Sequence, residues 1–182
     1  MKEAGAEVIN VLARRKGLGQ SGSGSVAAPD VCQKLFAQLS NKYDSQFGGF
    51  SGAPKFPQPS NLMVLFRLQS WSEESQHRKK VGLQMNLHTL DMMDKGGIHD
   101  HISKGFARYS TDKEWHVPHF EKMLYDQAQL TMAYTEAATI TGDKKYADVV
   151  DDILTYVSRD LTHALGGFFS AEDADSLPAA DR

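Results

Sequence analysis

Between Gly96 and Asp126 the sequence gathers side chains that can transfer protons near neutral pH. Four of the chain's seven histidines lie here: His99, His101, His116 and His119. Imidazole titrates near neutrality, so a histidine can both donate and accept a proton at physiological pH. We predict proton transfer by His116 and His119. The alternative is that these side chains only hydrogen-bond the loop backbone.

Carboxylates in and after this stretch are the natural partners of such histidines. Glycoside chemistry uses two carboxyl groups about 5–10 Å apart, one as acid and the other as base or nucleophile. The available groups are Asp100, Glu121, Asp126, Glu172, Asp173 and Asp175. We predict catalytic roles for Asp100, Glu121 and Asp173, and substrate contacts for Glu172 and Asp175. Helix capping and surface solvation are the alternative for each.

Aromatic residues alternate with these charged ones: Phe106, Tyr109, Trp115, Phe120 and Tyr125. They could form a stacking surface for a sugar ring, or they could pack as the core of the loop. We predict ligand contacts from Tyr109, Trp115 and the later Phe168.

Arg108 is a candidate anion-binding residue within the same stretch. A guanidinium matches the geometry of a carboxylate or phosphate with two parallel hydrogen bonds. We predict that Arg108 contacts an anionic ligand group or pairs with Asp112 or Glu114.

Two histidine pairs could offer metal ligands, His99 with His101 and His116 with His119. Pro118 lies inside the second pair and disfavours the helical geometry that places two imidazoles on one face. We therefore predict no metal and no cofactor.

Helical periodicity surrounds this stretch. Apolar residues recur every three or four positions in several segments, which is typical of amphipathic helices. The predicted helices cover residues 3–16, 30–43, 61–71, 78–94, 121–140 and 143–162. Ser60 is predicted to cap the third, and Gly142-Asp143 to form the tight turn of an antiparallel hairpin. No strand of five or more residues is predicted, only short extended pieces near Phe106–Tyr109 and Phe168–Ser170.

A helix followed by two glycines occurs three times, at Gly48-Gly49, Gly96-Gly97 and Gly166-Gly167. Glycine pairs end helices by adopting positive φ, and we predict this at Gly96-Gly97. The recurrence indicates stacked helical hairpins, because one amphipathic hairpin cannot bury its apolar face alone. The unequal intervals favour a closed toroid over an open solenoid. The proline-rich segment Ala53–Pro57 is predicted to be a rigid, exposed loop at its mouth.

Composition limits the class of partner. A formal net charge of −3 provides no basic field for nucleic acid, and no apolar run is long enough for a membrane span. Cys32 is the only cysteine, so no internal disulfide can form. The absence of a secretory signal favours an intracellular location.

Residues 1–29 are predicted to be a helix and a Gly/Ser linker, and residues 30–182 an incomplete toroid domain.

Three loop motifs make the sequence recognisable: FGGFSGAPKFPQP, GGIHDHISKGFARYSTDKEWHVPHFEKMLYDQAQL and GGFFSAEDADS. In this order they resemble the spermatogenesis-associated protein 20 family, over about Ala28–Ser176. The resemblance implies an all-α fold, a partial α/α toroid of antiparallel hairpins of six-hairpin glycosidase type. It also implies that loops 47–59, 96–120 and 163–176 bind or act on carbohydrate.

The chain departs from the family pattern in three ways. The family's thioredoxin-like domain is missing and only the first part of the toroid matches. We therefore expect the chain alone to be inactive, and its uncovered hairpin faces to self-associate. Ser103-Lys104-Gly105-Phe106 also stands where the family has GGGF or GQGF, which restricts the backbone there. The alternative function is a non-catalytic scaffold of a thioredoxin-domain protein linked to spermatogenesis or fertility.

Overall fold

The computed structural model describes residues 29–71 and 74–175. The chain divides into two compact units, Met1–Lys34 and Leu35–Arg182. The helix predicted at 3–16 and the linker after it lie outside the described residues, and the domain boundary at residue 29 stays a prediction. The described helices are α2 (Pro29–Lys42), α3 (Pro59–Ser70), α4 (Gln76–Lys95), α5 (Leu124–Thr141) and α6 (Lys144–Asp160).

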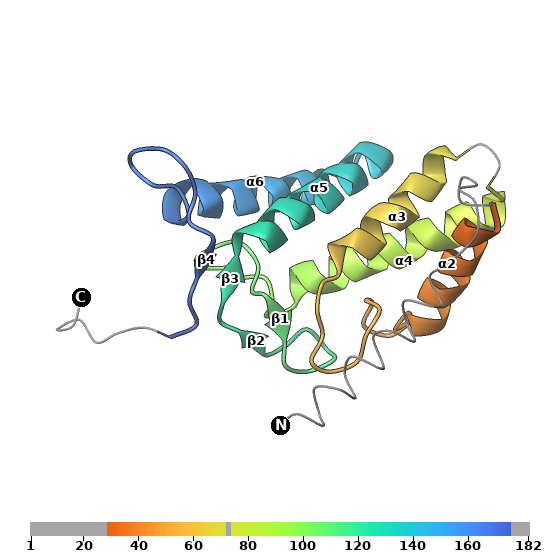
Figure 1. Ribbon diagram of the computed structural model, residues 1–182, viewed down its shortest axis with the longest axis horizontal. Helices are drawn as coiled ribbons and strands as arrows, with labels where there is room; N and C mark the ends of the chain where they lie inside the picture. The colour runs from red at the N-terminus through yellow and green to blue at the C-terminus, as the bar shows by residue number, and fades with distance from the viewer. Residues whose placement is uncertain (1–28, 72–73, 176–182) are drawn as a thin grey trace, which may run out of the picture. The chain divides into compact units, whose positions relative to one another are not determined.

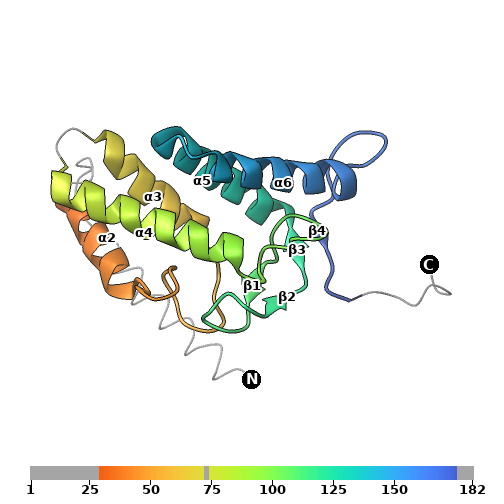
Figure 2. The same cartoon turned by 180° about the vertical axis from the view of Figure 1, so that it is seen from behind.

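Two helical hairpins make up most of the second unit. Helix α3 packs on α4, α5 packs on α6, and α3 also lies against α5 (Figure 1). The reverse view shows α4 and α6 each lying beside its hairpin partner (Figure 2). The long segment 96–123 connects the hairpins and carries most of the predicted site residues.

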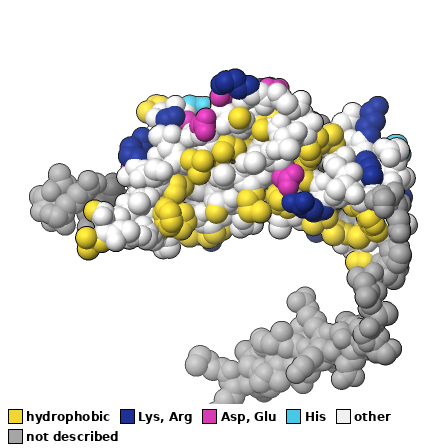
Figure 3. Space-filling model, turned by 90° about the horizontal axis from the view of Figure 1, so that it is seen from above, with side chains coloured by type: hydrophobic (Ala, Val, Ile, Leu, Met, Phe, Trp, Pro, Cys, Tyr) yellow, Lys and Arg dark blue, Asp and Glu magenta, His cyan; other side chains and the backbone are white. Residues whose placement is uncertain are grey.

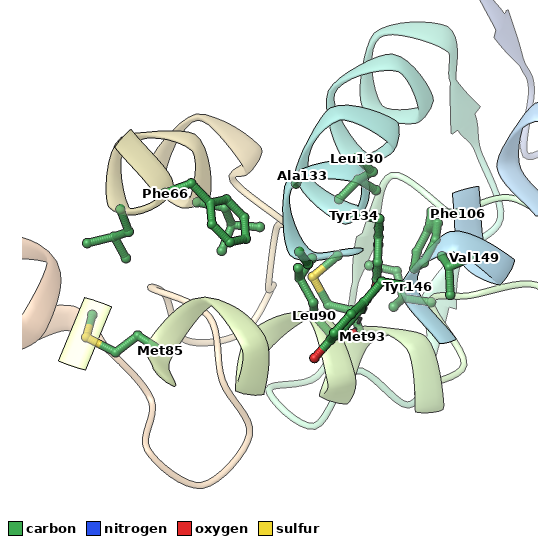
Figure 4. Packing of buried hydrophobic residues seen from close by; sticks show 14 of the residues in the cluster. Phe66, Met85, Leu90, Met93, Phe106, Leu130, Ala133, Tyr134, Tyr146 and Val149 are labelled. Atoms are coloured by element: carbon green, nitrogen blue, oxygen red, sulfur yellow. Dashed lines mark hydrogen bonds between the residues drawn. The ribbon is translucent and has the colours of Figure 1, made fainter. Parts of the chain in front are cut away.

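The apolar core lies where the two hairpins meet. Leu90 and Met93 of α4 face Leu130 and Tyr134 of α5 (Figure 4). All four are fully buried, and the Tyr134 hydroxyl donates to the Leu90 carbonyl oxygen at 2.9 Å. This hydrogen bond satisfies the buried hydroxyl, which would otherwise cost free energy in an apolar site.

The predicted turn of the second hairpin is confirmed. Gly142 ends α5 with φ 69°, and Asp143 caps α6 by accepting from the Lys145 amide at 3.0 Å. Glycine takes this left-handed conformation without the steric cost that a Cβ would bring.

Two predicted helix starts are wrong. Helix α3 begins at Pro59, so Ser60 lies inside its first turn instead of capping it. Helix α5 begins at Leu124, three residues after the predicted start at Glu121. The residues Lys122–Met123 form strand β3, which pairs with β4 (Ala171–Glu172) from a segment some fifty positions later. A pairing so distant in sequence overrides the local helical pattern.

A second small sheet pairs β1 (Tyr109–Ser110) with β2 (Pro118–His119). Ser110 also forms an isolated bridge with Lys55, which ties the proline-rich loop to this sheet. The loop is not simply exposed, because Lys55 is fully buried while its neighbour Phe56 is partly exposed.

Gly96-Gly97 does not adopt the predicted positive φ. Gly96 has φ −80°, whereas Gly48, Gly49, Gly166 and Gly167 all have positive φ. Glycine is required at position 97 because a side chain would not fit there. A Cβ on Gly97 would lie 2.1 Å from the His116 carbonyl oxygen.

We expect Gly97→Ala to destabilise the chain by about 1–3 kcal/mol, the usual cost of forcing an extra methyl group into a packed site. The matched control is Gly52→Ala, because a Cβ on Gly52 meets nothing within 4 Å. Urea unfolding of both variants measures the difference. Equal midpoints would contradict the steric explanation.

Several large apolar side chains remain exposed, including Met132 and Ile140 on α5 and Leu154 on α6. Figure 3 shows hydrophobic side chains in a broken band across one face. These residues are available for the expected self-association, which stays a prediction. None of the described helices combines the length and apolarity that a membrane crossing requires.

Candidate functional site

A pocket of about 490 Å³ lies where the loop after α4 meets the segment containing β4. It brings together Asp100, Glu172 and Asp173, three of the predicted site residues. Phe120 also lines it and is 72% exposed. The other lining residues are Gly97, Ile98, His99, His101, Ile102, Ser103, Ala107, Pro118, Lys122 and Ala174. The volume falls in the range of small-molecule pockets, which is roughly 300–1,000 Å³.

Lys122 is the charged centre of this pocket. Its ammonium group contacts the Asp100 carboxylate at 2.8 Å and donates to the Lys104 carbonyl oxygen at 2.8 Å. It also lies 4.4 Å from the centre of the Tyr156 ring. The Tyr156 hydroxyl in turn donates to the Glu172 carboxylate at 2.7 Å. Asp100 and Glu172 are therefore linked through Lys122 and Tyr156.

Strand pairing explains how these residues meet. Lys122 on β3 lies directly opposite Glu172 on β4. The backbone turn before Phe106 has φ 71° at Lys104 and 74° at Gly105, and a Cβ on Gly105 would lie 2.7 Å from the Tyr156 ring. Lys104 takes the left-handed conformation despite its side chain, and its ammonium group pairs with Asp152. A lysine therefore occupies the turn at which the chain departs from the glycine-rich family pattern.

The protonation of Asp100 follows from its contacts. Burial opposes its charge, but the hydrogen bonds from Lys122 and from the Ser103 and Ile102 amides outweigh burial and lower the pKa of Asp100. Asp100 is thus ionised at neutral pH and serves as an ion-pair partner, not as a proton donor. For Tyr156, burial and the hydrogen bond to Glu172 raise the pKa of the hydroxyl, which keeps it protonated.

His99 borders the pocket and joins α4 to α6. Its Nδ1 lies 3.1 Å from the Asp94 carboxylate, its Nε2 lies 2.9 Å from the Asp152 carboxylate, and its ring stacks on Phe106. Burial opposes the charged ring, but the hydrogen bonds to Asp94 and Asp152 outweigh burial and raise the pKa of His99. The neighbouring ring of His101 and the ammonium group of Lys104 are the other titratable groups close by.

We expect His99→Gln to destabilise the chain by about 1.5–3 kcal/mol at pH 6, the range for hydrogen bonds to charged groups. A pKa raised in the folded state means that the stabilisation is complete below about pH 6.5 and is lost as the pH rises through the folded-state pKa. The difference from the parent chain should therefore shrink by pH 9. Thermal unfolding at both pH values measures it, with exposed His77→Gln as control; a constant difference would contradict the charged-ring account.

The predicted histidines do not join this pocket. His116 is exposed and lines a separate open hollow with Lys95 and Glu114. His119 lies on β2, where its ring stacks on Tyr109 at 4.8 Å, and Tyr109 lies 4.8 Å from Phe56. Neither histidine lines the pocket of Asp100 and Asp173. Neither is therefore placed to exchange a proton directly with these two carboxyl groups.

Arg108 pairs with Glu121 at 2.8 Å, and not with Asp112 or Glu114 as predicted. The Asp112 carboxylate is instead occupied by backbone amides, accepting from His116 at 3.0 Å and from Val117 at 2.7 Å. Short-range turn hydrogen bonds of this kind are a common use of aspartate.

Three other residues with predicted ligand contacts do not line the pocket. Trp115 is fully buried and its indole nitrogen donates to the Phe47 carbonyl oxygen at 2.8 Å, so the predicted sugar contact is wrong in this structure. Phe168 is 64% exposed and does not line the pocket. Asp175 is exposed, and its amide donates to the Asp173 carboxylate.

The sequence did not reveal Lys122 and Tyr156. Both were counted within predicted helices, where Lys122 gave no functional signal and Tyr156 belonged to the apolar stripe. Only the pairing of β3 with β4 brings them to the carboxylates. For metal binding, residues 29–71 and 74–175 contain no cluster of three or more potential His, Cys, Asp or Glu ligands.

No family model matches the chain. Curated relatives do match: the chain is 54% identical to spermatogenesis-associated protein 20 of Homo sapiens over 152 residues, 84% of the chain. It is 41% identical over 181 residues to an uncharacterized protein of Caenorhabditis elegans. It spans only 19% of the human protein and 24% of the worm protein.

Solved structures match the fold. A sugar epimerase from a ruminal bacterium aligns with a TM-score of 0.60 and 15% identity, covering 79% of this chain and 40% of the epimerase. The cellobiose 2-epimerase of Bacillus thermoamylovorans aligns with a TM-score of 0.60 and 14% identity, covering 81% and 42%. At such identities the likeness concerns the fold alone, and it confirms the predicted toroid. The chain therefore belongs to the spermatogenesis-associated protein 20 family and has the fold of part of a six-hairpin, glycosidase-like α/α toroid.

Proposed function

We propose that the chain binds a neutral carbohydrate in the pocket of Asp100, Lys122 and Glu172. The observation that carries this proposal is the meeting of Asp100 with Glu172 and Asp173 in one pocket, from loops about seventy residues apart. Carboxylates accept hydrogen bonds from sugar hydroxyls, and a lysine ammonium group donates them. The two sugar epimerases that share the fold support the ligand class by analogy.

Phe120 supplies the apolar part of such a site. Its side chain is largely exposed at the pocket edge, where a ring can stack against the C–H face of a sugar. Lys122 is held by Asp100 and by a carbonyl oxygen, so its position is fixed before any ligand arrives. A fixed polar group loses little entropy on binding, which favours affinity.

A calorimetric titration with a panel of neutral mono- and disaccharides tests this proposal. We expect one or more sugars to bind and Phe120→Ala and Asp173→Asn each to weaken binding about tenfold, because loss of a stacking or hydrogen-bonding contact costs roughly 1–2 kcal/mol. The matched control is Phe168→Ala, a similarly exposed phenylalanine outside the pocket. The absence of binding across the panel, or equal weakening by both phenylalanine variants, would reject the pocket as a sugar site.

A scaffold without a ligand is the second candidate, and one observation favours it. Asp100, Lys122 and Glu172 each already have a partner within the fold. These contacts tie the loop after α4 to β3, β4 and α6, which a purely structural role would also require. Under this alternative Lys122→Met lowers thermal stability and no sugar binds to the parent chain.

A further inference from the structure

The start of α5 holds a second polar cluster, distinct from the pocket. Arg108, Glu121 and Asp126 interact there, and Tyr125 and His119 are the other titratable groups beside them. Lys122 belongs to the pocket, whereas the preceding residue, Glu121, forms an ion pair with Arg108. The Arg108 amide also donates to the Glu121 carbonyl oxygen at 2.8 Å, which fixes the two backbones together.

Asp126 is the unusual member of this cluster. It is only 7% exposed, and its Oδ2 finds no hydrogen-bond partner among the described residues. A buried carboxyl oxygen without a partner carries the full cost of leaving water. Arg108, the obvious cation, is engaged by Glu121 and does not form an ion pair with Asp126 among the described residues.

The same short segment holds two further buried polar atoms without described partners, Nε of Arg108 and Nδ1 of His119. The residues pair along one ladder: Tyr109, next to Arg108, lies opposite His119, and Arg108 bonds to Glu121. Buried polar atoms in folded proteins are almost always satisfied, so the unpaired Asp126 oxygen and the Nε atom of Arg108, whose charge acts on Asp126, point to a ligand with polar groups of its own.

The charge state narrows the class of ligand. Burial raises the pKa of Asp126 to about 6, with Arg108 lowering it and the Glu121 charge raising it further. A protonated carboxyl donates one hydrogen bond and accepts others, while the ion pair of Arg108 and Glu121 carries no net charge. The cluster therefore suits a hydroxyl-rich neutral molecule better than an anion.

We propose that Arg108, Glu121 and Asp126 form a second ligand site, for a neutral polyhydroxylated molecule, in which the buried and unpaired carboxyl of Asp126 forms a hydrogen bond with a ligand hydroxyl group. Tyr125 and Phe56 are both partly exposed on the elements that carry and flank this cluster, and they supply aromatic surface. Retaining a buried acid that an asparagine could replace at a gain in stability is typical of functional sites. Binding at this second site does not require binding in the pocket.

Carbon-13 NMR of the aspartate carboxyl groups in the full chain tests the inference, with Asp126 assigned as the signal missing from Asp126→Asn. Glucose, mannose and cellobiose serve as probes. We expect at least one to raise the Asp126 titration midpoint by half a unit or more, because it binds the protonated form about threefold more tightly than the ionised form. Phe120→Ala, which alters the pocket, should leave this shift intact, so failure of the pocket and failure of this site are distinguishable.

The asparagine variant gives the second measurement. Its amide retains a donor, so it should bind the same sugar with an affinity that does not change between pH 5 and pH 8, whereas binding to the parent chain should weaken as Asp126 ionises. A midpoint near the ordinary aspartate value, or one that no neutral sugar moves, would overturn the proposal. So would a lower midpoint with glucuronate, which would mark an anion site.

Discussion

Replacing Lys55 with methionine should destabilise the chain by about 3 kcal/mol, the lower end of the cost of breaking a buried ion pair, because the Asp44 side chain that remains is 23% exposed. Lys55 is 0% exposed, contacts the Asp44 carboxylate at 2.8 Å and donates to the Lys113 carbonyl oxygen at 2.8 Å. Its ammonium group also lies 5.1 Å from the Trp115 ring centre. One side chain therefore ties the loop after α2 to the segment that carries β1.

The Asp44 carboxylate is the reason for so large an expected loss. Burial opposes its charge, but Lys55 and the Phe47 and Gln46 amides outweigh burial and lower the pKa of Asp44. Without Lys55 the carboxylate keeps its charge and loses its cation. Urea unfolding at pH 7 measures the effect, with exposed Lys144→Met as control, which should change stability by less than about 0.5 kcal/mol.

A double variant separates charge from packing at this site. If the loss comes from the unpaired carboxylate, adding Asp44→Asn to Lys55→Met should restore part of the lost stability. Losses that simply add, or a Lys55→Met variant as stable as the parent, would show that the buried ion pair does not hold the two loops together.

Asp126→Asn should have the opposite effect and stabilise the chain at neutral pH. The pKa of Asp126 is raised from 3.8 to about 6 in the folded state. Between about pH 4 and pH 6 the folded chain therefore binds more protons than the unfolded chain, and stability falls as the pH rises through this window. The pKa shift corresponds to a loss of about 3 kcal/mol in folding stability as the carboxyl ionises. Asparagine carries no charge, so the variant avoids this loss.

Thermal unfolding from pH 4 to pH 8 measures this effect. The variant should match the parent near pH 4, exceed its melting temperature at pH 7.5 and show a flatter profile. Asp148→Asn, an aspartate at an exposed position on α6, is the control and should follow the parent profile. Parallel profiles for Asp126→Asn and the parent would mean that the Asp126 carboxyl is already ionised at low pH.

Local sequence patterns predicted the helical hairpins well. The features that they predicted wrongly depend on contacts between residues far apart in the sequence. The turn at Gly142-Asp143 was predictable because a glycine stop and an aspartate cap act within a few residues. The start of α5 was not, because pairing with β4 holds Lys122–Met123 extended. Gly97 was assigned to a turn, whereas it is small because the His116 carbonyl oxygen lies against it.

The same distinction applies to the candidate site. Residue type alone placed Asp100, Glu172 and Asp173 among the candidates, and the structure brings all three to one pocket. Residue type did not distinguish Trp115, which fills the core, from Phe120, which lies at the pocket edge. It also ranked Asp126 below its neighbours, because burial and an absent partner cannot be read from a sequence.

Amide chemical-shift mapping of the chain with neutral sugars tests whether the loops after α4 and around β4 form a carbohydrate site. We expect saturable shifts concentrated at Ile98, His101, Phe120 and Asp173, with little change along α2. No saturable shift with any sugar, or shifts confined to the groove between α2 and α4 around Tyr43 and His88, would contradict it.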